Sequence, residues 1–173
     1  IFDERGKLLT GADVPSVVAL LEGLRVDAFG INCGMGPEQM IPILEQITKY
    51  SSLPVIVKPN AGLPKQKNGE TYYDVEPDEF ARIMQEVVKG GACVIGGCCG
   101  TTKEHIRALA DAVRGMEIHK PLAAHRRILA SERQNVEITL DGGFIVVGER
   151  INPTGKKKLQ AELREGRLDL VRE

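Results

Sequence analysis

Three short apolar segments, each followed by a turn and an amphipathic helical pattern, constrain the fold of this chain more than any other feature. They lie at residues 26–31, 53–57 and 92–95. Strands of this kind, alternating with helices, are typical of a parallel sheet that is covered by helices. Three strands cannot close a barrel by themselves. Residues 1–115 therefore form either an open α/β sheet or the last part of a larger (β/α) barrel.

Helical periodicity predicts four helices in the same part of the chain. Asp13 is expected to cap the first helix and Pro37 to begin the second. The third, over residues 78–89, has the clearest pattern, with apolar side chains at i, i+3, i+4, i+7 and i+8. Thr101 is expected to cap the fourth, with Glu104 completing a capping box.

The composition excludes several classes of function. The 173-residue chain has a net charge of −1, and no basic stretch is interleaved with aromatic residues, so we expect no nucleic-acid partner. No apolar run approaches the roughly 20 residues that cross a bilayer, so we expect no membrane partner. The four cysteines do not resemble a secreted disulfide framework, and we interpret them as reduced thiols in a cytoplasmic protein.

The character of the chain changes after Gly115. Residues 116–135 are richer in His and Arg and are interpreted as a linker. Residues 136–140 and 144–147, around an Asp-Gly-Gly turn, predict a β-hairpin, and a helix is expected over residues 156–165. The chain begins with isoleucine and stops inside a helical pattern, so we expect it to be a piece of a longer protein.

Two adjacent cysteines lie in the glycine-rich turn at residues 94–102. Neighbouring side chains of a strand point to opposite faces, so Cys98 and Cys99 can serve one site only if the strand has already ended. The flanking glycines supply that break, because glycine tolerates backbone angles that other residues avoid. Taken alone, the pair fits buried packing as well as it fits a metal site.

A third cysteine, Cys33, occupies the corresponding position after the first strand. The carboxyl ends of the strands form one face of a (β/α) barrel, where active sites lie. We therefore predict that Cys33, Cys98 and Cys99 converge. Three thiolates with one open position are what a catalytic zinc ion requires.

The remaining cysteine and the histidines fit a metal site less well. Cys93 lies at the opposite end of its strand and is assigned to packing. His105 is expected on the exposed side of the fourth helix, and His119 and His125 belong to the linker. We interpret all three histidines as surface or capping residues.

Three motifs lie at the carboxyl ends of the predicted strands: residues 30–34 (GINCG), 59–64 (PNAGLP) and 96–101 (GGCCGT). The first and third resemble the paired zinc signatures of the homocysteine S-methyltransferases. The second is similar to the segment that lines the homocysteine site of that family, and the order of the motifs is the same. The resemblance covers residues 1–115 and implies the C-terminal three βα units of a (β/α)8 TIM barrel.

A fourth motif narrows the resemblance. Residues 148–155 (GERINPTG) resemble the opening of the pterin-binding barrel that follows the homocysteine barrel in the cobalamin-dependent members of the family. Betaine-dependent relatives lack this second barrel. The resemblance implies that residues 136–173, with the predicted hairpin and helix, begin a pterin-binding barrel in a modular bacterial enzyme.

The resemblance also implies a reaction. Zinc held by Cys33, Cys98 and Cys99 would bind the sulfur of homocysteine as a thiolate, because a cation favours the deprotonated form. The thiolate would then take a methyl group from methylcobalamin, carried by a cobalamin-binding module of the same or another chain, giving methionine. Methyltetrahydrofolate would be the further methyl source in the full-length protein.

Five further residues are candidates on the same basis. Asn60 and Gly62 are expected to orient the amino acid, and Asn32 either joins them or holds its turn through side-chain-to-backbone bonds. Arg150 and Asn152 are candidates for the folate end of the second barrel. The alternative for these two is a salt-bridged arginine and a turn asparagine.

Two other functions remain open. The first keeps the acceptor and changes the donor, as in a betaine- or S-methylmethionine-type homocysteine methyltransferase, and the GERINPTG motif argues against it. The second is a zinc-binding fragment without turnover, because most strands of the first barrel are absent. We expect the isolated chain to be inactive for this reason.

Overall fold

The computed structural model describes residues 1–122, 126–148 and 151–172. The chain forms two compact units, Ile1–Leu140 and Asp141–Glu173. None of the helices in the described ranges is both long enough and apolar enough to span a bilayer.

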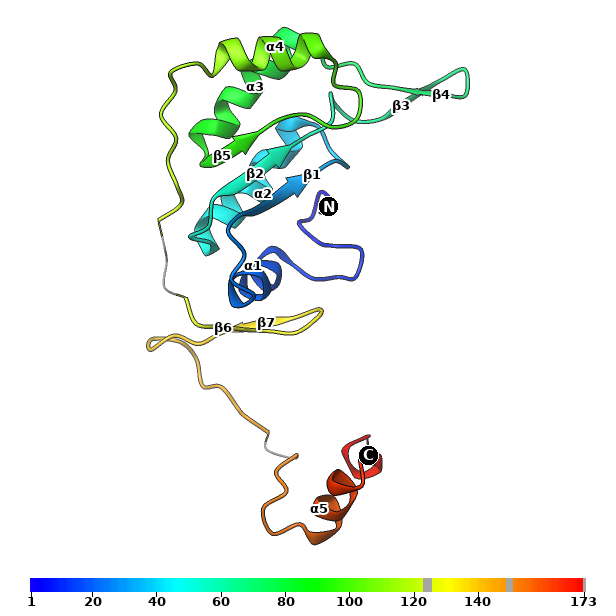
Figure 1. The fold of residues 1–173 in the computed structure, drawn as a ribbon, viewed down its shortest axis with the longest axis vertical. Coiled ribbons are helices and arrows are strands. Elements are labelled where there is room, and N and C mark those ends of the chain that lie inside the picture. The colour runs from blue at the N-terminus through cyan, green and yellow to red at the C-terminus, as the bar shows by residue number, and fades with distance from the viewer. Residues whose placement is uncertain (123–125, 149–150, 173) are drawn as a thin grey trace. The chain divides into compact units, whose positions relative to one another are not determined.

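A three-stranded parallel sheet forms the centre of the first unit (Figure 1). Its strands are β1 (Phe29–Asn32), β2 (Val55–Lys58) and β5 (Ala92–Ile95), in the order β1-β2-β5. The pairing of β1 with β2 and of β2 with β5 is parallel throughout. This arrangement confirms the predicted parallel sheet. Three strands do not form the closed barrel that the resemblance implies.

The connecting helices follow the predicted order. They are α1 (Val14–Gly23), α2 (Pro37–Tyr50), α3 (Pro77–Lys89) and α4 (Lys103–Ala112). The Asp13 carboxylate accepts the Ser16 N–H at 3.1 Å and caps α1, as predicted. Pro37 occupies the first turn of α2, where its missing N–H is no loss.

The core lies between the sheet and these helices, since α2 packs on β2 and α3 packs on β5. Phe29, Ile31, Val55 and Val57 are buried on this side, together with the predicted apolar stripes of α2 and α3. The alternate residues of the strands face the other way, and Val94 among them is 50% exposed. In the described part of the chain, helices thus cover one face of the sheet rather than both.

The fourth helix differs from the prediction in its cap and its buried stripe. It is capped one residue later, by Thr102, and the capping box is completed by His105 instead of Glu104. The residues turned inward are His105 and Leu109, whereas the apolar Ile106 is exposed. His105 is held inward by its contacts with the Val75 carbonyl and the Phe80 ring.

A short hairpin projects from the carboxyl end of β2 (Figure 1). It consists of β3 (Lys65–Lys67) and β4 (Glu70–Tyr72), paired antiparallel. Asn68 and Gly69 turn the chain at its tip, and both have positive φ, which is the conformation that a two-residue hairpin turn requires.

The hairpin predicted over 136–140 and 144–147 is wrong. The structure pairs β6 (Ile128–Ala130) with β7 (Asn135–Glu137), and residues 138–148 contain no strand. The Ser131 hydroxyl accepts the Gln134 N–H at 3.1 Å and fixes the observed turn. Asn135 also donates to the Asp13 carboxylate at 2.9 Å, which anchors β7 to the cap of α1. Residues of the predicted second strand are left uncovered, and Phe144 is 96% exposed.

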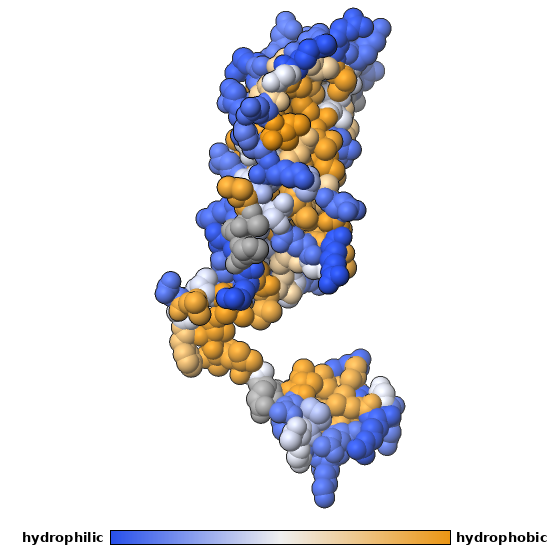
Figure 2. Space-filling view, turned by 60° about the vertical axis from the view of Figure 1, so that its left-hand side comes forward, coloured by the Kyte–Doolittle hydropathy of each residue, from blue (hydrophilic) through white to orange (hydrophobic). Residues whose placement is uncertain are grey.

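The second unit contains α5 (Lys157–Arg164) and α6 (Asp169–Arg172). The first of these matches the helix predicted over residues 156–165. Leu159 is buried in this unit. Figure 2 shows that apolar side chains remain at the surface of both units, and Leu20, Leu129 and Leu168 are examples.

Candidate metal centre

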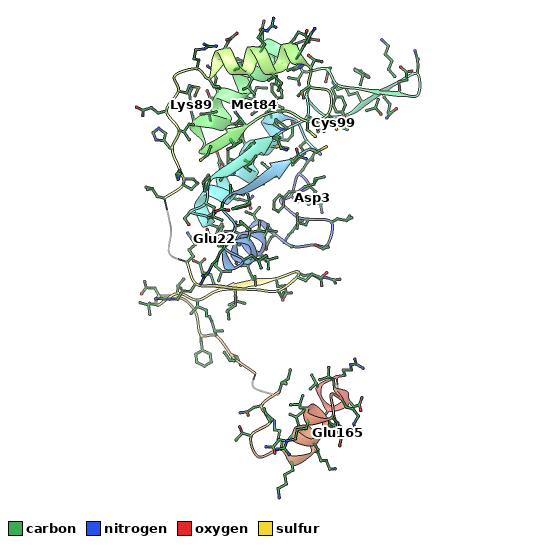
Figure 3. All side chains as sticks on the ribbon, in the orientation of Figure 1. Asp3, Glu22, Met84, Lys89, Cys99 and Glu165 are labelled. Carbon is green, nitrogen blue, oxygen red and sulfur yellow. The ribbon has the colours of Figure 1, made fainter. Side chains whose placement is uncertain are left out.

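The three predicted cysteines meet at the carboxyl end of the sheet. Cys33 follows β1, and Cys98 and Cys99 follow β5, so the site is built from turns at both sides of β2. Figure 3 labels Cys99 at the end of the sheet toward which the strand arrows point. The two adjacent cysteines lie outside the strand, as predicted, because β5 ends at Ile95.

The first turn has a left-handed backbone at a residue that is not glycine. Cys33 has φ of 63° and Gly34 has φ of 80°. Such a conformation is uncommon for residues with a Cβ and persists only where the surroundings enforce it. One enforcing contact is the hydrogen bond from the Cys33 N–H to the Lys58 carbonyl, at 3.0 Å. The main chain of β2 therefore helps to fix the backbone conformation from which the Cys33 side chain projects.

The second turn packs against the first without intervening side chains. An ideal Cβ placed on Gly36 would lie 2.9 Å from the Gly62 Cα, closer than real contacts allow. The Asn60 N–H donates to the Met35 carbonyl at 2.9 Å across the same junction. Glycine at position 36 thus permits the two turns to touch through their backbones.

The third turn is held by the same segment. The Cys98 N–H donates to the Pro59 carbonyl at 2.8 Å, and the Ala61 N–H donates to the Cys99 carbonyl at 2.9 Å. The Thr101 hydroxyl also donates to the Cys98 carbonyl at 2.6 Å. Residues 59–61 therefore fix the backbone of both adjacent cysteines.

The spacing of the three sulfur atoms fits a single small cation. Cys33 Sγ lies 3.5 Å from Cys99 Sγ, and Cys98 Sγ lies 3.9 Å from Cys99 Sγ. All three sulfurs lie within 4.8 Å of one another. Zn–S bonds of about 2.3 Å in a tetrahedron place sulfur atoms about 3.8 Å apart. The thiols are free, and a tetrahedral ion held by all three would have one position left for another ligand.

Asn60 connects the cysteines through its side chain. Its Oδ1 accepts the Cys99 N–H at 3.1 Å, and the residue is 2% exposed. A hydrogen bond with Cys33 is among the causes that lower the pKa of that thiol. In the structure, Asn60 therefore organises the cysteines. Its expected contact with an amino-acid substrate remains a prediction.

The surroundings of Cys33 and Cys98 shift the pKa values of these two thiols in opposite directions. Burial acts to raise the pKa of Cys33, but hydrogen bonds from Cys98, the Gly34 N–H, Cys99 and Asn60 outweigh it and lower the pKa below its ordinary value of 9.0. Burial and the hydrogen bond with Cys33 raise the pKa of Cys98. Cys33 is therefore the first of this pair to become a thiolate.

The other predicted residues have mixed positions. Gly62 is buried in the second turn with φ of 104°. Asn32 is exposed at the end of β1, and its side chain makes no hydrogen bond to the residues that the structure describes. The Asn152 side chain accepts the Thr154 N–H at 2.9 Å, as a turn asparagine does, and Arg150 lies outside the described residues.

Cys93 and the histidines lie apart from the sulfur cluster. Cys93 Sγ contacts the Gly91 carbonyl at 3.6 Å, consistent with the packing role assigned to it. His119 is exposed beside Glu117. His125 lies outside the described residues. The expectation that His105 is exposed is wrong, since it is 7% exposed and packs edge-on against Phe80.

Sequence reasoning missed two residues that support the site. The ring of His105 accepts the Thr102 N–H at Nδ1, and its Nε2 lies 2.8 Å from the Val75 carbonyl. Tyr73, two residues before Val75, lies against the cysteine turn. The Tyr72–Tyr73 pair was the available sequence signal for Tyr73, because an aromatic ring buries a large apolar area where it packs.

Comparison with known proteins agrees with this geometry. A family model described as homocysteine S-methyltransferase matches residues 1–113. Proteins named methionine synthase from Mycobacterium tuberculosis and Mycobacterium leprae are each 33% identical to the chain, over 153 and 158 residues. Each alignment covers 88% of this chain and 13% of the relative, so the chain spans a small part of their length.

A solved structure shows the same relationship. The homocysteine methyltransferase of Escherichia coli, in its oxidized form, aligns with a TM-score of 0.51 and 32% identity, over 64% of this chain and 33% of that protein. The stretch matched by the family model contains all three clustered cysteines. By its sequence and by the fold around these cysteines, the chain belongs to the homocysteine S-methyltransferase family.

Proposed function

We propose that this chain provides the metal-binding and homocysteine-binding end of a methionine synthase-type enzyme. The observation that carries the proposal is the convergence of three free thiols, from two turns, at spacings that suit one zinc ion. Bound zinc would hold the substrate sulfur and favour its thiolate form near neutral pH.

The protein's own residues would contribute placement. Cys33, Cys98 and Cys99 present their sulfurs on one side and leave the other side open to the substrate. Asn60 Oδ1 accepts the Cys99 N–H, and this hydrogen bond holds the backbone of the cysteine turn in place. Gly62 lies in the turn after β2 and Asn32 is the last residue of β1, and we retain both as candidates for orienting a bound amino acid.

The methyl donor is inferred from the second unit and the relatives. Residues 148–155 resemble the start of a pterin-binding barrel, and the mycobacterial relatives are named methionine synthase. We infer that methylcobalamin, recharged from methyltetrahydrofolate, supplies the methyl group from another module. Arg150 and Asn152 remain candidates for the folate end. Free thiols suit a reducing, cytoplasmic setting.

A second candidate changes the donor to betaine or S-methylmethionine. The Escherichia coli relative, named only a homocysteine methyltransferase, makes this relevant. Spectral titration of the full-length protein with a corrinoid and with a folate separates the two proposals, because only the first requires the protein to bind both. We also propose that the isolated chain is inactive, and homocysteine-dependent methyl transfer by the 173-residue chain would refute that.

Zinc content tests the proposal directly. The chain should bind one zinc ion, and Cys98→Ser should weaken zinc binding by more than the roughly 10–100-fold typical of losing a group that only supports a ligand. Cys93→Ser is the matched control, because Cys93 lies outside the cluster, and it should bind zinc normally. Equal zinc affinity of the Cys98→Ser and Cys93→Ser variants, measured against a chelating dye, would show that the three-thiolate site is wrong.

A further inference from the structure

Two polar side chains at the carboxyl end of the sheet lie on the face that the helices of the described part leave uncovered. Asn32 and Lys58 are the last residues of β1 and β2 and are paired directly in the register of the two strands. The residue before each of them is buried in the core, so both side chains point to the opposite face. Both are exposed, and each is followed at once by a turn that contributes to the sulfur cluster.

The side chain of Lys58 extends across the sheet from β2 toward the end of β5. An ideal Cβ on Gly96 would lie 3.4 Å from Lys58 Cγ and 3.6 Å from Lys58 Cδ, so the aliphatic stem of the lysine packs over position 96. The Gly96 N–H donates to the Val57 carbonyl at 3.1 Å and holds the two strands together at this point. The stem therefore lies on the uncovered face, beside the residue that stands two positions before Cys98.

Both side chains have donor groups that are not used inside the protein. Within the ranges that the structure describes, neither the Lys58 ammonium nor the Asn32 amide has a hydrogen-bond or ion-pair partner. Lys65, which follows the next turn, differs because it is paired with Asp74. An ammonium group next to a primary amide suits a carboxylate ligand, since both groups donate hydrogen bonds and one carries a positive charge.

The backbone places Lys58 next to the sulfur cluster. Its carbonyl accepts the Cys33 N–H at 3.0 Å, and the carbonyl of the following residue, Pro59, accepts the Cys98 N–H at 2.8 Å. Lys58 thus lies between the two turns that supply the sulfurs. Homocysteine carries its thiol and its carboxylate on one short carbon chain, so a group that binds the carboxylate has to lie close to the metal centre.

We propose that Lys58, assisted by Asn32, binds the carboxylate of the amino-acid substrate and so selects homocysteine over thiols that lack a carboxylate. This inference rests on the proposed function, in which the substrate sulfur reaches a metal ion held by the cysteines. A zinc ion with three thiolates carries a net negative charge, so it repels a substrate that brings a further thiolate and a carboxylate. A positive side chain beside the cluster offsets that repulsion.

Two thiols that differ only in the carboxylate test this assignment. Homocysteine and 3-mercaptopropylamine share the thiol, the amine and the length of the carbon chain. In the Co²⁺-loaded chain, binding of either thiol changes the thiolate-to-cobalt absorption, which gives its affinity without any turnover. Lys58→Met should lower the affinity for homocysteine about twofold to fivefold, the range expected for an exposed ion pair, and leave that for 3-mercaptopropylamine unchanged. Lys58→Arg keeps the charge and should keep the preference for homocysteine.

Lys67→Met removes an exposed lysine from β3 and is the matched control, which should bind both thiols as the unaltered chain does. An unchanged ratio of the two affinities in Lys58→Met would overturn the proposal. An equal loss for both thiols would also overturn it, because that result means a general disturbance of the metal centre, and so would a Co²⁺ spectrum that responds to neither thiol. Failure of the unaltered chain to bind Co²⁺ or Zn²⁺ would instead refute the proposed function, and with it the premise of the Lys58 assignment.

Discussion

Asn60 and Cys99, 39 positions apart in the sequence, are joined by a 3.1 Å hydrogen bond from the Cys99 N–H to the Asn60 side-chain oxygen. The Asn60 side chain is buried, so the hydrogen bond forms away from bulk solvent. The bond links the central turn of the sheet to the cysteine farthest along the chain. It gives Asn60 a structural duty that is separate from any contact with substrate.

Replacement of Asn60 by alanine should therefore damage the site before any substrate is added. The Cys99 N–H would lose its buried acceptor, which lowers the free energy of unfolding by about 1–3 kcal/mol. Asn32→Ala is the control, since Asn32 is exposed and should change stability by less than about 0.5 kcal/mol. Urea unfolding and zinc affinity of both variants check this, and equal effects would contradict the assignment.

The unequal acidities of Cys33 and Cys98 predict a pH profile. In the metal-free chain, Cys33 should be alkylated at lower pH than Cys98, because its pKa is lowered while that of Cys98 is raised. The two pKa shifts change the free energy of unfolding with pH in opposite directions. The Cys33 contribution is fully present above pH 9.0 and is lost as the pH falls through its lowered pKa.

The Cys98 contribution is fully present below pH 9.0 and is lost as the pH rises through its raised pKa. Site-resolved labelling across this range measures both acidities. Alkylation of Cys98 before Cys33 would contradict the hydrogen-bond pattern of the cluster.

Two glycines with the same backbone angle should respond differently to alanine. Gly100 and Gly115 have φ of 77° and 78°, so each substitution strains the backbone by roughly 1–2 kcal/mol. The added methyl group meets nothing at Gly115, but at Gly100 it collides with Tyr73. Gly100→Ala should therefore lower the free energy of unfolding by more than Gly115→Ala does. Identical unfolding curves for the two variants would mean that Tyr73 does not lie on the turn.

His105→Ala should destabilise the chain by about 1–3 kcal/mol, because the Val75 carbonyl loses its donor and the Thr102 N–H at the start of α4 loses its acceptor. His119→Ala is the control on an exposed histidine and should stay within about 0.5 kcal/mol. Thermal unfolding monitored by circular dichroism compares them. A neutral His105→Ala variant would show that the bridge between α4 and Val75 does not contribute to stability.

The sheet and the cysteine cluster could be predicted because their signals are local. Periodicity locates the helices, and a turn after each strand places Cys33, Cys98 and Cys99 at one edge of any parallel sheet. The cap of α1 by Asp13 is equally local, since the carboxylate and its Ser16 partner are close in sequence.

The features that were predicted wrongly depend on competing local signals or on contacts with residues far away in the sequence. Two adjacent threonines can each cap α4, and the contact of His105 with Val75, 30 positions away, accompanies Thr102 as the cap. The hairpin near the linker was placed by the Asp-Gly-Gly turn, whereas the observed one is anchored by Asn135 to Asp13, 122 positions away. No pattern within a sequence window reports such contacts.

The main chain of residues 58–61 has a consequence for how the site responds to disturbance. It accepts from Cys33 and Cys98, donates to the carbonyl of Cys99, and donates to Met35 in the first turn. The main chain of all three cysteines is therefore held by one stretch of backbone. A displacement of residues 58–61 would move the three cysteines together, so the spacing between their sulfur atoms would change little.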